Sequence, residues 1–229
     1  MGFYNNYNFD GLKLFSQLQK GTILNEPCQE FVEVVNYLKS TVAHGITVAE
    51  IGLGYGATAL QILKRLDEDD VYYCFDFEDR LNDFASDLQA RDFGIKCEVV
   101  LAGNSHYVND SYNWNLSKLI FSTREQNLNG LFDAVYLDGA HTFLYSGLAI
   151  CMLKELIKNG GFLILDDLFW TVANSPTCRD DAIKNKMPKE QMEDMQILRA
   201  QEIFLSRDQN FEKLSPPDAY RGIFRKRLR

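Results

Sequence analysis

Short apolar segments alternate with segments of helical periodicity through the middle of this chain of 229 residues. The apolar segments have the length and composition of buried β-strands and occupy residues 46–53, 71–77, 96–103, 132–141 and 160–170. The helical segments between them occupy residues 57–66, 79–94, 115–127 and 143–158. Because right-handed crossovers place helices on both faces of a sheet, this alternation predicts a doubly wound α/β fold with a mostly parallel sheet.

The pattern changes after residue 171. A charged segment predicts a helix over residues 181–200, and two later segments, 202–214 and 219–227, have strand composition and are separated by Ser-Pro-Pro. We expect these strands to pair antiparallel at one edge of the sheet, which makes seven strands in all. A further helix is expected over 25–40, before the first strand.

The length of the chain suits one domain with a complete core. We divide this predicted domain, residues 1–229, into an amino-terminal helical segment (1–45) and a Rossmann-like core (46–229). The formal net charge of −8 argues against a protein that coats phosphate backbones, because such binding relies on clustered Lys and Arg. The basic carboxyl terminus is interpreted as a solvated strand end, and no nucleic-acid partner is expected.

The cysteines and the amino terminus indicate the cellular compartment of the protein. The five cysteines have no Cys-x-x-Cys spacing and are expected to be reduced core residues: Cys28, Cys74, Cys97, Cys151 and Cys178. The first ten residues lack the basic and apolar regions of a secretion signal, and no apolar run has the length of a membrane span. We therefore expect a cytoplasmic protein without a membrane partner, and a homo-oligomer is left open.

The stretch VAEIGLGYGATAL, residues 48–60, runs from a predicted strand through three glycines into a predicted helix. Gly52, Gly54 and Gly56 have no β-carbon, so the chain can turn sharply and a ligand can approach the main chain beside the unpaired N–H groups of the helix. Such a turn could serve a nicotinamide, a flavin or only a tight connection. Asp76 ends the second predicted strand, where a carboxylate can accept hydrogen bonds from both hydroxyls of a ribose.

The glycine spacing is Gly-x-Gly-x-Gly, and it is preceded by Glu50. Glu-Ile-Gly-Leu-Gly-Tyr-Gly followed by a strand ending in Asp resembles the first two motifs of class I S-adenosylmethionine-dependent methyltransferases, and the resemblance covers nearly the whole chain. It implies cofactor contacts from Glu50, Gly52, Gly54, Tyr55 and Gly56 to the methionine part, from Asp76 to the ribose, from Asn104 and Ser105 near the adenine, and from Asp138. The alternative for Asn104 and Ser105 is that they only close a turn.

The fourth and fifth predicted strands end in Leu-Asp-Gly-Ala-His and Leu-Asp-Asp. These endings bring Asp138, Asp166 and Asp167 to the same edge of the sheet as the glycines. Three carboxylates repel one another unless a cation intervenes, and an all-oxygen set suits Mg²⁺, Mn²⁺ or Ca²⁺ better than Zn²⁺. The alternative is that these residues cap helices or simply end strands.

The two acidic endings resemble those of metal-dependent O-methyltransferases, the group that contains catechol O-methyltransferase, macrocin-type sugar O-methyltransferases and cephalosporin-hydroxylase-like proteins. The resemblance implies that Asp138, Asp166 and Asp167 bind a divalent metal and that His141, three residues after the first acid, is the base. A neutral imidazole can accept a proton near pH 7. His106, after the third strand, is a weaker candidate for the pocket.

The sequence therefore predicts an O-methyltransferase that uses S-adenosylmethionine and a divalent cation (Mg²⁺ or Mn²⁺). The predicted acceptor is a polar small molecule with a hydroxyl group, such as a sugar or nucleotide-linked sugar. Alternatives are a catechol-type O-methyltransferase, an NAD-dependent oxidoreductase, against which the glycine spacing argues, and a non-catalytic protein that binds the cofactor.

Overall fold

The computed structural model describes residues 26–91, 93–175 and 186–228. The helices are α2 (Gln29–Thr41), α3 (Ala57–Leu63), α4 (Glu78–Ala90), α5 (Tyr112–Glu125), α6 (Phe143–Leu156), the short 3₁₀ helix η2 (Val172–Asn174), α8 (Lys189–Glu193) and α9 (Gln196–Phe204). The strands are β1 (Thr47–Ile51), β2 (Val71–Phe77), β3 (Glu98–Asn104), β4 (Phe132–Leu137), β5 (Ile157–Leu165), β6 (Phe211–Lys213) and β7 (Gly222–Lys226).

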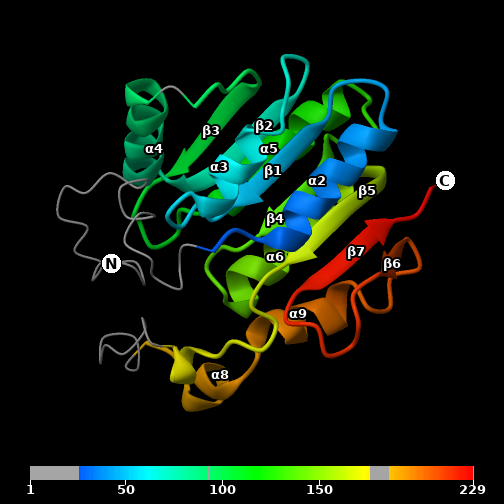
Figure 1. The fold of residues 1–229 in the computed structure, drawn as a ribbon. Coiled ribbons are helices and arrows are strands. Elements are labelled where there is room, and N and C mark those ends of the chain that lie inside the picture. Colours follow the sequence, from blue (N-terminus) through cyan, green and yellow to red (C-terminus); the bar gives the residue numbers. More distant parts are fainter. Residues whose placement is uncertain (1–25, 92, 176–185, 229) are drawn as a thin grey trace.

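The seven strands form one sheet in the order β3-β2-β1-β4-β5-β7-β6 (Figure 1). The first five strands are parallel, and β7 pairs antiparallel with both β5 and β6. The chain leaves β1 toward β2 on one side and returns to β4 on the other, so strand order reverses at β1. The predicted doubly wound fold with a late antiparallel pair is confirmed.

Two apolar cores lie on opposite faces of the sheet. The first contains residues of α2, α3 and α4 together with side chains of the central strands, among them Phe31, Ile62 and Phe84. The second contains residues of α5, α6 and α9, among them Leu116 and Ile150. Because both faces are covered, the central strands are buried along nearly their whole length, which explains their continuous apolar runs.

Three local predictions are wrong in detail. In the described part of 181–200, two helices, α8 and α9, replace one, and they are separated at Asp194, whose backbone is extended. The segment expected to be a strand from residue 202 continues α9 as far as Phe204, because the Phe204 ring stacks on Phe143 of α6, 5.8 Å between centroids. Cys151 lies on the exposed side of α6, whereas Cys28, Cys74 and Cys97 are buried as expected.

Some predictions fall on residues that lie outside the described ranges. They concern Cys178 and most of the amino-terminal segment (1–45). In the described ranges, no helix has both the length and the apolar character needed to cross a membrane.

Candidate active site

The candidate site lies along the carboxyl ends of β2, β1, β4 and β5. Main-chain hydrogen bonds between neighbouring strands continue one residue beyond each strand. They run from the Gly52 N–H to the Phe75 carbonyl (2.8 Å), from the Asp138 N–H to the Ile51 carbonyl (2.8 Å) and from the Asp166 N–H to the Leu137 carbonyl (3.1 Å). The glycine loop and both acidic strand ends are therefore held in adjacent register, as the strand endings predicted.

The loop between β1 and α3 is shaped by two glycines with different surroundings. Gly52 has φ +95°, and a β-carbon there would lie 2.2 Å from the Asp138 carbonyl oxygen, so only glycine allows β1 and β4 to end this close together. Gly54 has φ +55°, and a β-carbon there would meet no atom of the described residues within 4 Å. The main chain at Gly54 thus faces open space, where a ligand can approach it. Gly56, also at positive φ, is the N-cap of α3.

Asp76 holds the glycine loop in place. Its two carboxylate oxygens accept hydrogen bonds from the N–H groups of Leu53 (2.7 Å) and Phe77 (2.7 Å). Burial raises the pKa of Asp76, although Arg80 and these two N–H donors oppose the shift. Each carboxylate oxygen has a second lone pair, so Asp76 retains the capacity to accept hydroxyl donors.

Glu50 lies within β1 and is buried below the loop. It accepts a hydrogen bond from the Tyr72 hydroxyl. Burial raises its pKa to about 8, and the nearby charge of Asp76 adds to the shift while the Tyr72 hydrogen bond opposes it. Tyr55 is half-buried beside Gly54. Glu50 thus joins β1 to β2 through Tyr72, inside the sheet.

The residues after β3 form a local turn. The Ser105 N–H and hydroxyl both donate to the Asp110 carboxylate (2.7 and 2.6 Å), and the Asn104 amide donates to the Ser105 carbonyl (3.3 Å). The His106 ring stacks on Phe77 with 4.2 Å between centroids. The turn-closing contacts of Asn104 and Ser105 are present, and their predicted approach to an adenine stays a prediction.

The structure brings Asp138, His141 and Asp167 together. His141 Nε2 lies 3.6 Å from Asp138 Oδ1, and His141 Nδ1 lies 3.4 Å from Asp167 Oδ2. One potential ligand atom from each of the three side chains lies within 4.8 Å of the others. Burial, together with the charges of Asp166, Asp167 and Glu50, raises the pKa of Asp138 well above its usual value. Two carboxylates and an imidazole are a donor set that suits a divalent cation such as Mn²⁺, so the residues fit a metal.

Asp166 has different partners. Its carboxylate accepts a hydrogen bond from the Tyr136 hydroxyl, which also lies 3.2 Å from Asp138 Oδ2. Arg221 Nε lies 3.0 Å from Asp166 Oδ1. The structure thus places all three predicted acids at one edge, but only Asp138 and Asp167 share the group with His141.

None of the three acids caps a helix through its side chain. The N-cap of α6 is Thr142, whose hydroxyl accepts from the Tyr145 N–H, and the N-cap of η2 is Thr171, whose hydroxyl accepts from the Asn174 N–H. The capping alternative therefore has no support at Asp138 or Asp167.

Backbone strain is concentrated around this group. Ala140, His141 and Asp167 have φ values of +50°, +46° and +56°, and they are three of the four non-glycine residues at positive φ in the described ranges. A left-handed conformation costs an L-residue about 1–2 kcal/mol. Residues held in such conformations cluster at functional sites, because there a side chain must be aimed in a way that relaxed backbone does not allow.

Four residues of the site were missed by the sequence analysis. Trp170 lies with its ring centroid 5.2 Å from that of His141, and the Tyr220 hydroxyl donates to Asp167. Tyr136 has a sequence signal, since it precedes Asp138 by two residues and so lies on the same face of the strand. Tyr220 and Arg221 come from the chain before and at the start of β7, and no local pattern connects them with the acids.

Comparisons with known proteins agree with this geometry. A methyltransferase-domain family matches residues 49–168, more than half of the chain. No curated protein matches the sequence significantly.

Solved structures share the fold at low sequence identity. A protein from Corynebacterium glutamicum has a TM-score of 0.60 at 14% identity, covering 97% of this chain and 93% of that chain. SAH-bound methyltransferase PaMTH1 from Podospora anserina has a TM-score of 0.55 at 13% identity, covering 94% and 86%. MycE, a methyltransferase of the mycinamycin biosynthetic pathway in complex with Mg and SAH, has a TM-score of 0.54 at 16% identity, covering 94% of this chain and 54% of that chain.

The family match includes the glycine loop, Asp76 and both acidic strand ends, whereas the similarity to solved structures establishes the fold. The chain belongs to the methyltransferase-domain family and is a class I S-adenosylmethionine-dependent methyltransferase.

Proposed function

We propose that the protein is a divalent-metal-dependent O-methyltransferase that acts on a hydroxyl group of a polar small molecule. One observation carries the proposal. The loop that would hold the methyl donor and the group formed by Asp138, His141 and Asp167 meet at Asp138, whose N–H bonds to the Ile51 carbonyl and whose carbonyl lies against Gly52. A methyl donor and an acceptor bound at these two places would be neighbours.

The cofactor would lie along the glycine loop, between Gly54 and Asp76. The open space at Gly54 would admit the methionine part, and Asp76 would accept hydrogen bonds from the ribose hydroxyls with the lone pairs that Leu53 and Phe77 leave free. Asn104 and Ser105, at the end of the neighbouring strand β3, would face the adenine. We further propose that residues 1–229 act as one domain.

The metal would lie at the acidic edge, held by ligands among Asp138, Asp166 and Asp167 with His141 beside them. A bound divalent cation supplies a positive field that acidifies a hydroxyl group of the acceptor. The Mg in the structure of MycE, which shares this fold, supports the choice of a hard divalent ion.

His141 is the residue that would receive the hydroxyl proton. Its ring nitrogens face Asp138 and Asp167, so an imidazolium formed by proton transfer would be stabilised by a carboxylate on either side. The positive φ of His141 and the packing of Trp170 against its ring fix the direction of the imidazole. Holding donor and acceptor in line at one sheet edge would provide much of the rate enhancement.

The acceptor would be a small hydroxyl-bearing molecule such as a sugar or nucleotide-linked sugar. Two partly exposed aromatic residues belong to this region: Tyr220 (48% exposed), whose hydroxyl donates to Asp167, and Phe169 (38% exposed), which follows Asp167 by two residues. Aromatic surface next to carboxylates offers a ring face for the flat side of a sugar and acceptors for its hydroxyls. A catechol would use the same two features, so the choice between them rests on the experiment.

Calorimetric titration tests the cofactor and metal assignments together. S-adenosylmethionine, S-adenosylhomocysteine and NAD are each titrated with Mg²⁺ or Mn²⁺ and again with EDTA. We expect the first two to bind and NAD not to bind.

Transfer of a labelled methyl group to a panel of sugars, nucleotide sugars and catechols then identifies the acceptor. In this assay His141→Ala should lower kcat by about 10²–10⁴-fold. Cofactor binding without methyl transfer to any hydroxyl, with or without metal, would favour the non-catalytic alternative.

A further inference from the structure

The Asp166 carboxylate is surrounded by donors of its own protein. It is 6% exposed, and its Oδ1 accepts from the Asp167 N–H at 2.8 Å. Its Oδ2 accepts from the Tyr136 hydroxyl, and burial together with Asp138 and Asp166 raises the pKa of Tyr136 well above its usual value, so this hydroxyl stays a donor. Asp166 is the predicted metal ligand that stands apart from the Asp138, His141 and Asp167 group.

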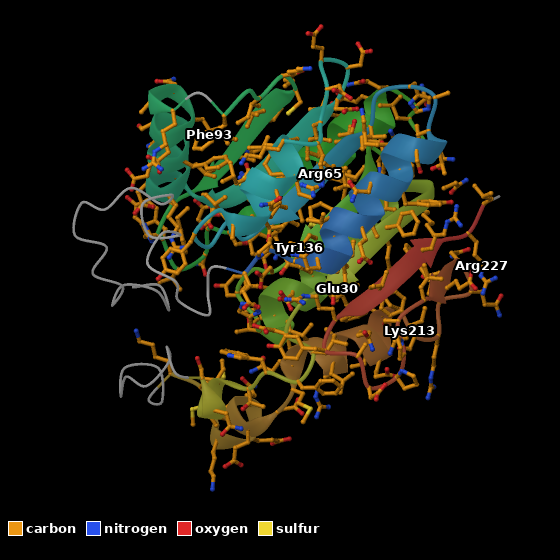
Figure 2. The ribbon with its side chains drawn as sticks, viewed as in Figure 1. Glu30, Arg65, Phe93, Tyr136, Lys213 and Arg227 are labelled. Carbon is orange, nitrogen blue, oxygen red and sulfur yellow. The ribbon has the colours of Figure 1, made fainter. Side chains whose placement is uncertain are left out.

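The charged partner of Asp166 is Arg221. The guanidinium lies 3.0 Å from Asp166 through Nε and 3.1 Å from the Glu30 carboxylate through Nη1. Arg221 therefore connects the chain just before β7 with the end of β5 and with α2. Figure 2 labels Glu30 of α2 and Tyr136 of β4, which lie close together in that view. Burial by itself would lower the pKa of Arg221, but the charges around it, of which Asp166 contributes most, together raise the pKa, so the arginine stays charged.

The charges of the edge differ from those of a three-acid site. Asp138, Asp166 and Asp167 carry three negative charges when ionised, and the single positive charge of Arg221 lies beside Asp166 and is shared with Glu30. We propose that Arg221 withholds Asp166 from the metal, so that the ion is held by Asp138 and Asp167, with His141 left free as the base, and its affinity is set by the guanidinium. This inference rests on the proposed metal site and concerns which residues form it.

The arrangement has two physical consequences. A positive charge so close to the ion repels it, and this repulsion persists because both groups are partly shielded from water. A set of two carboxylates should also bind a divalent ion more weakly than a set of three carboxylates does. Arg221 is thus a positioning residue, since it acts on the metal through Asp166 and through its charge.

Four variants separate charge from ligation. Arg221→Met removes the positive charge, Asp166→Asn removes the negative charge, and the double variant removes both and restores the net charge of the wild type. Arg225→Met is the matched control, because Arg225 lies on β7, which Arg221 directly precedes, but pairs with the Gly160 carbonyl and with the rings of Tyr37 and Phe162. Binding of Mn²⁺ to the cofactor-free proteins is measured from the loss of the free Mn²⁺ signal in electron paramagnetic resonance, and near-ultraviolet circular dichroism checks the fold.

We expect Arg221→Met to bind Mn²⁺ about tenfold more tightly than the wild type and Asp166→Asn to bind it more weakly. The double variant should bind within about threefold of the wild type, as should Arg225→Met. Unchanged or weaker binding by folded Arg221→Met would overturn the inference, and so would a double variant weakened by about tenfold or more, because Asp166 would then be a ligand. If Arg221→Met does not fold, the double variant, in which Asp166 no longer leaves a buried unpaired charge and only the partly exposed Glu30 loses its partner, decides alone. A wild type that binds no Mn²⁺ would overturn the proposed metal site itself.

Discussion

An alanine at Gly52 should destabilise the protein much more than an alanine at Gly54, although both glycines belong to one motif and both have positive φ. At Gly54 the only cost is the left-handed backbone, about 1 kcal/mol, because the new methyl group meets no atom of the described part of the chain within 4 Å. At Gly52 the methyl group would lie 2.2 Å from the Asp138 carbonyl oxygen and 2.7 Å from its carbon. Backbone atoms cannot rotate away, so the ends of β1 and β4 must separate, which adds about 2 kcal/mol.

The expected losses are therefore about 3 kcal/mol for Gly52→Ala and about 1 kcal/mol for Gly54→Ala. In a protein of this length 1 kcal/mol lowers Tm by about 2–4 °C, so the expected decreases are about 9 °C and about 3 °C. Tm is measured by circular dichroism and the free energy of unfolding by urea titration, both without cofactor so that ligand binding does not contribute.

The two variants should rank in the opposite order when the affinity for S-adenosylmethionine is measured instead of stability. The methyl group of Gly54→Ala would project into the open space that the cofactor is proposed to fill, so this variant should bind S-adenosylmethionine more weakly in calorimetry while remaining nearly as stable as the wild type. Equal losses of Tm, or a larger loss for Gly54→Ala, would refute the argument from the Asp138 carbonyl.

Three further predictions concern single residues. Asp138→Asn should abolish metal-dependent methyl transfer and leave the metal-free free energy of unfolding unchanged or higher, because one of several repelling buried charges is removed; a marked loss in urea titration would contradict this. Glu50 keeps its proton up to a pKa of about 8 in the folded state, against an ordinary glutamate pKa of 4.5 in the unfolded chain, so stability should fall as pH rises between these values. Glu50→Gln should reduce this fall by at least about 1 kcal/mol in urea titrations at about pH 5 and about pH 8. Asn127, at φ +55° after α5, should tolerate Gly, whereas Asn127→Ala should lose about 1 kcal/mol of stability by the same assay.

The central part of the fold could be predicted because its signals are local. Each buried strand is a continuous apolar run, and each helix repeats apolar residues at its own period, so β2 was predicted with the bounds it has, Val71–Phe77. The position of the glycine loop and the acids followed from the same logic, because parallel strands end at one edge. The end of α9, as far as Phe204, was predicted to be a strand because of its apolar residues. These residues are apolar because they pack on α6, and this contact leaves no local periodic signal in the sequence.

For the candidate site, the sequence indicated which residues belong to it better than it indicated which of them contact one another. Sequence reasoning proposed the acids and His141, but it did not reveal the pairing of Asp166 with Arg221, which is 55 residues further along the chain and reaches Asp166 only because β7 pairs with β5. The support of the loop by Asp76 through the Leu53 N–H was also missed, since a side chain at a strand end can face either a ligand or the neighbouring loop.

The close packing of Gly52 against the Asp138 carbonyl has a consequence for how the two ligands would influence each other. The methyl donor and the metal ion would both contact the main chain around Ile51, Gly52 and Asp138. These main-chain atoms are so closely packed that one segment cannot move without moving the other. Occupancy on one side would therefore change affinity on the other, and thermodynamic linkage requires the same factor in both directions. The affinities for the cation and for the methyl donor would then have to be measured as a linked pair.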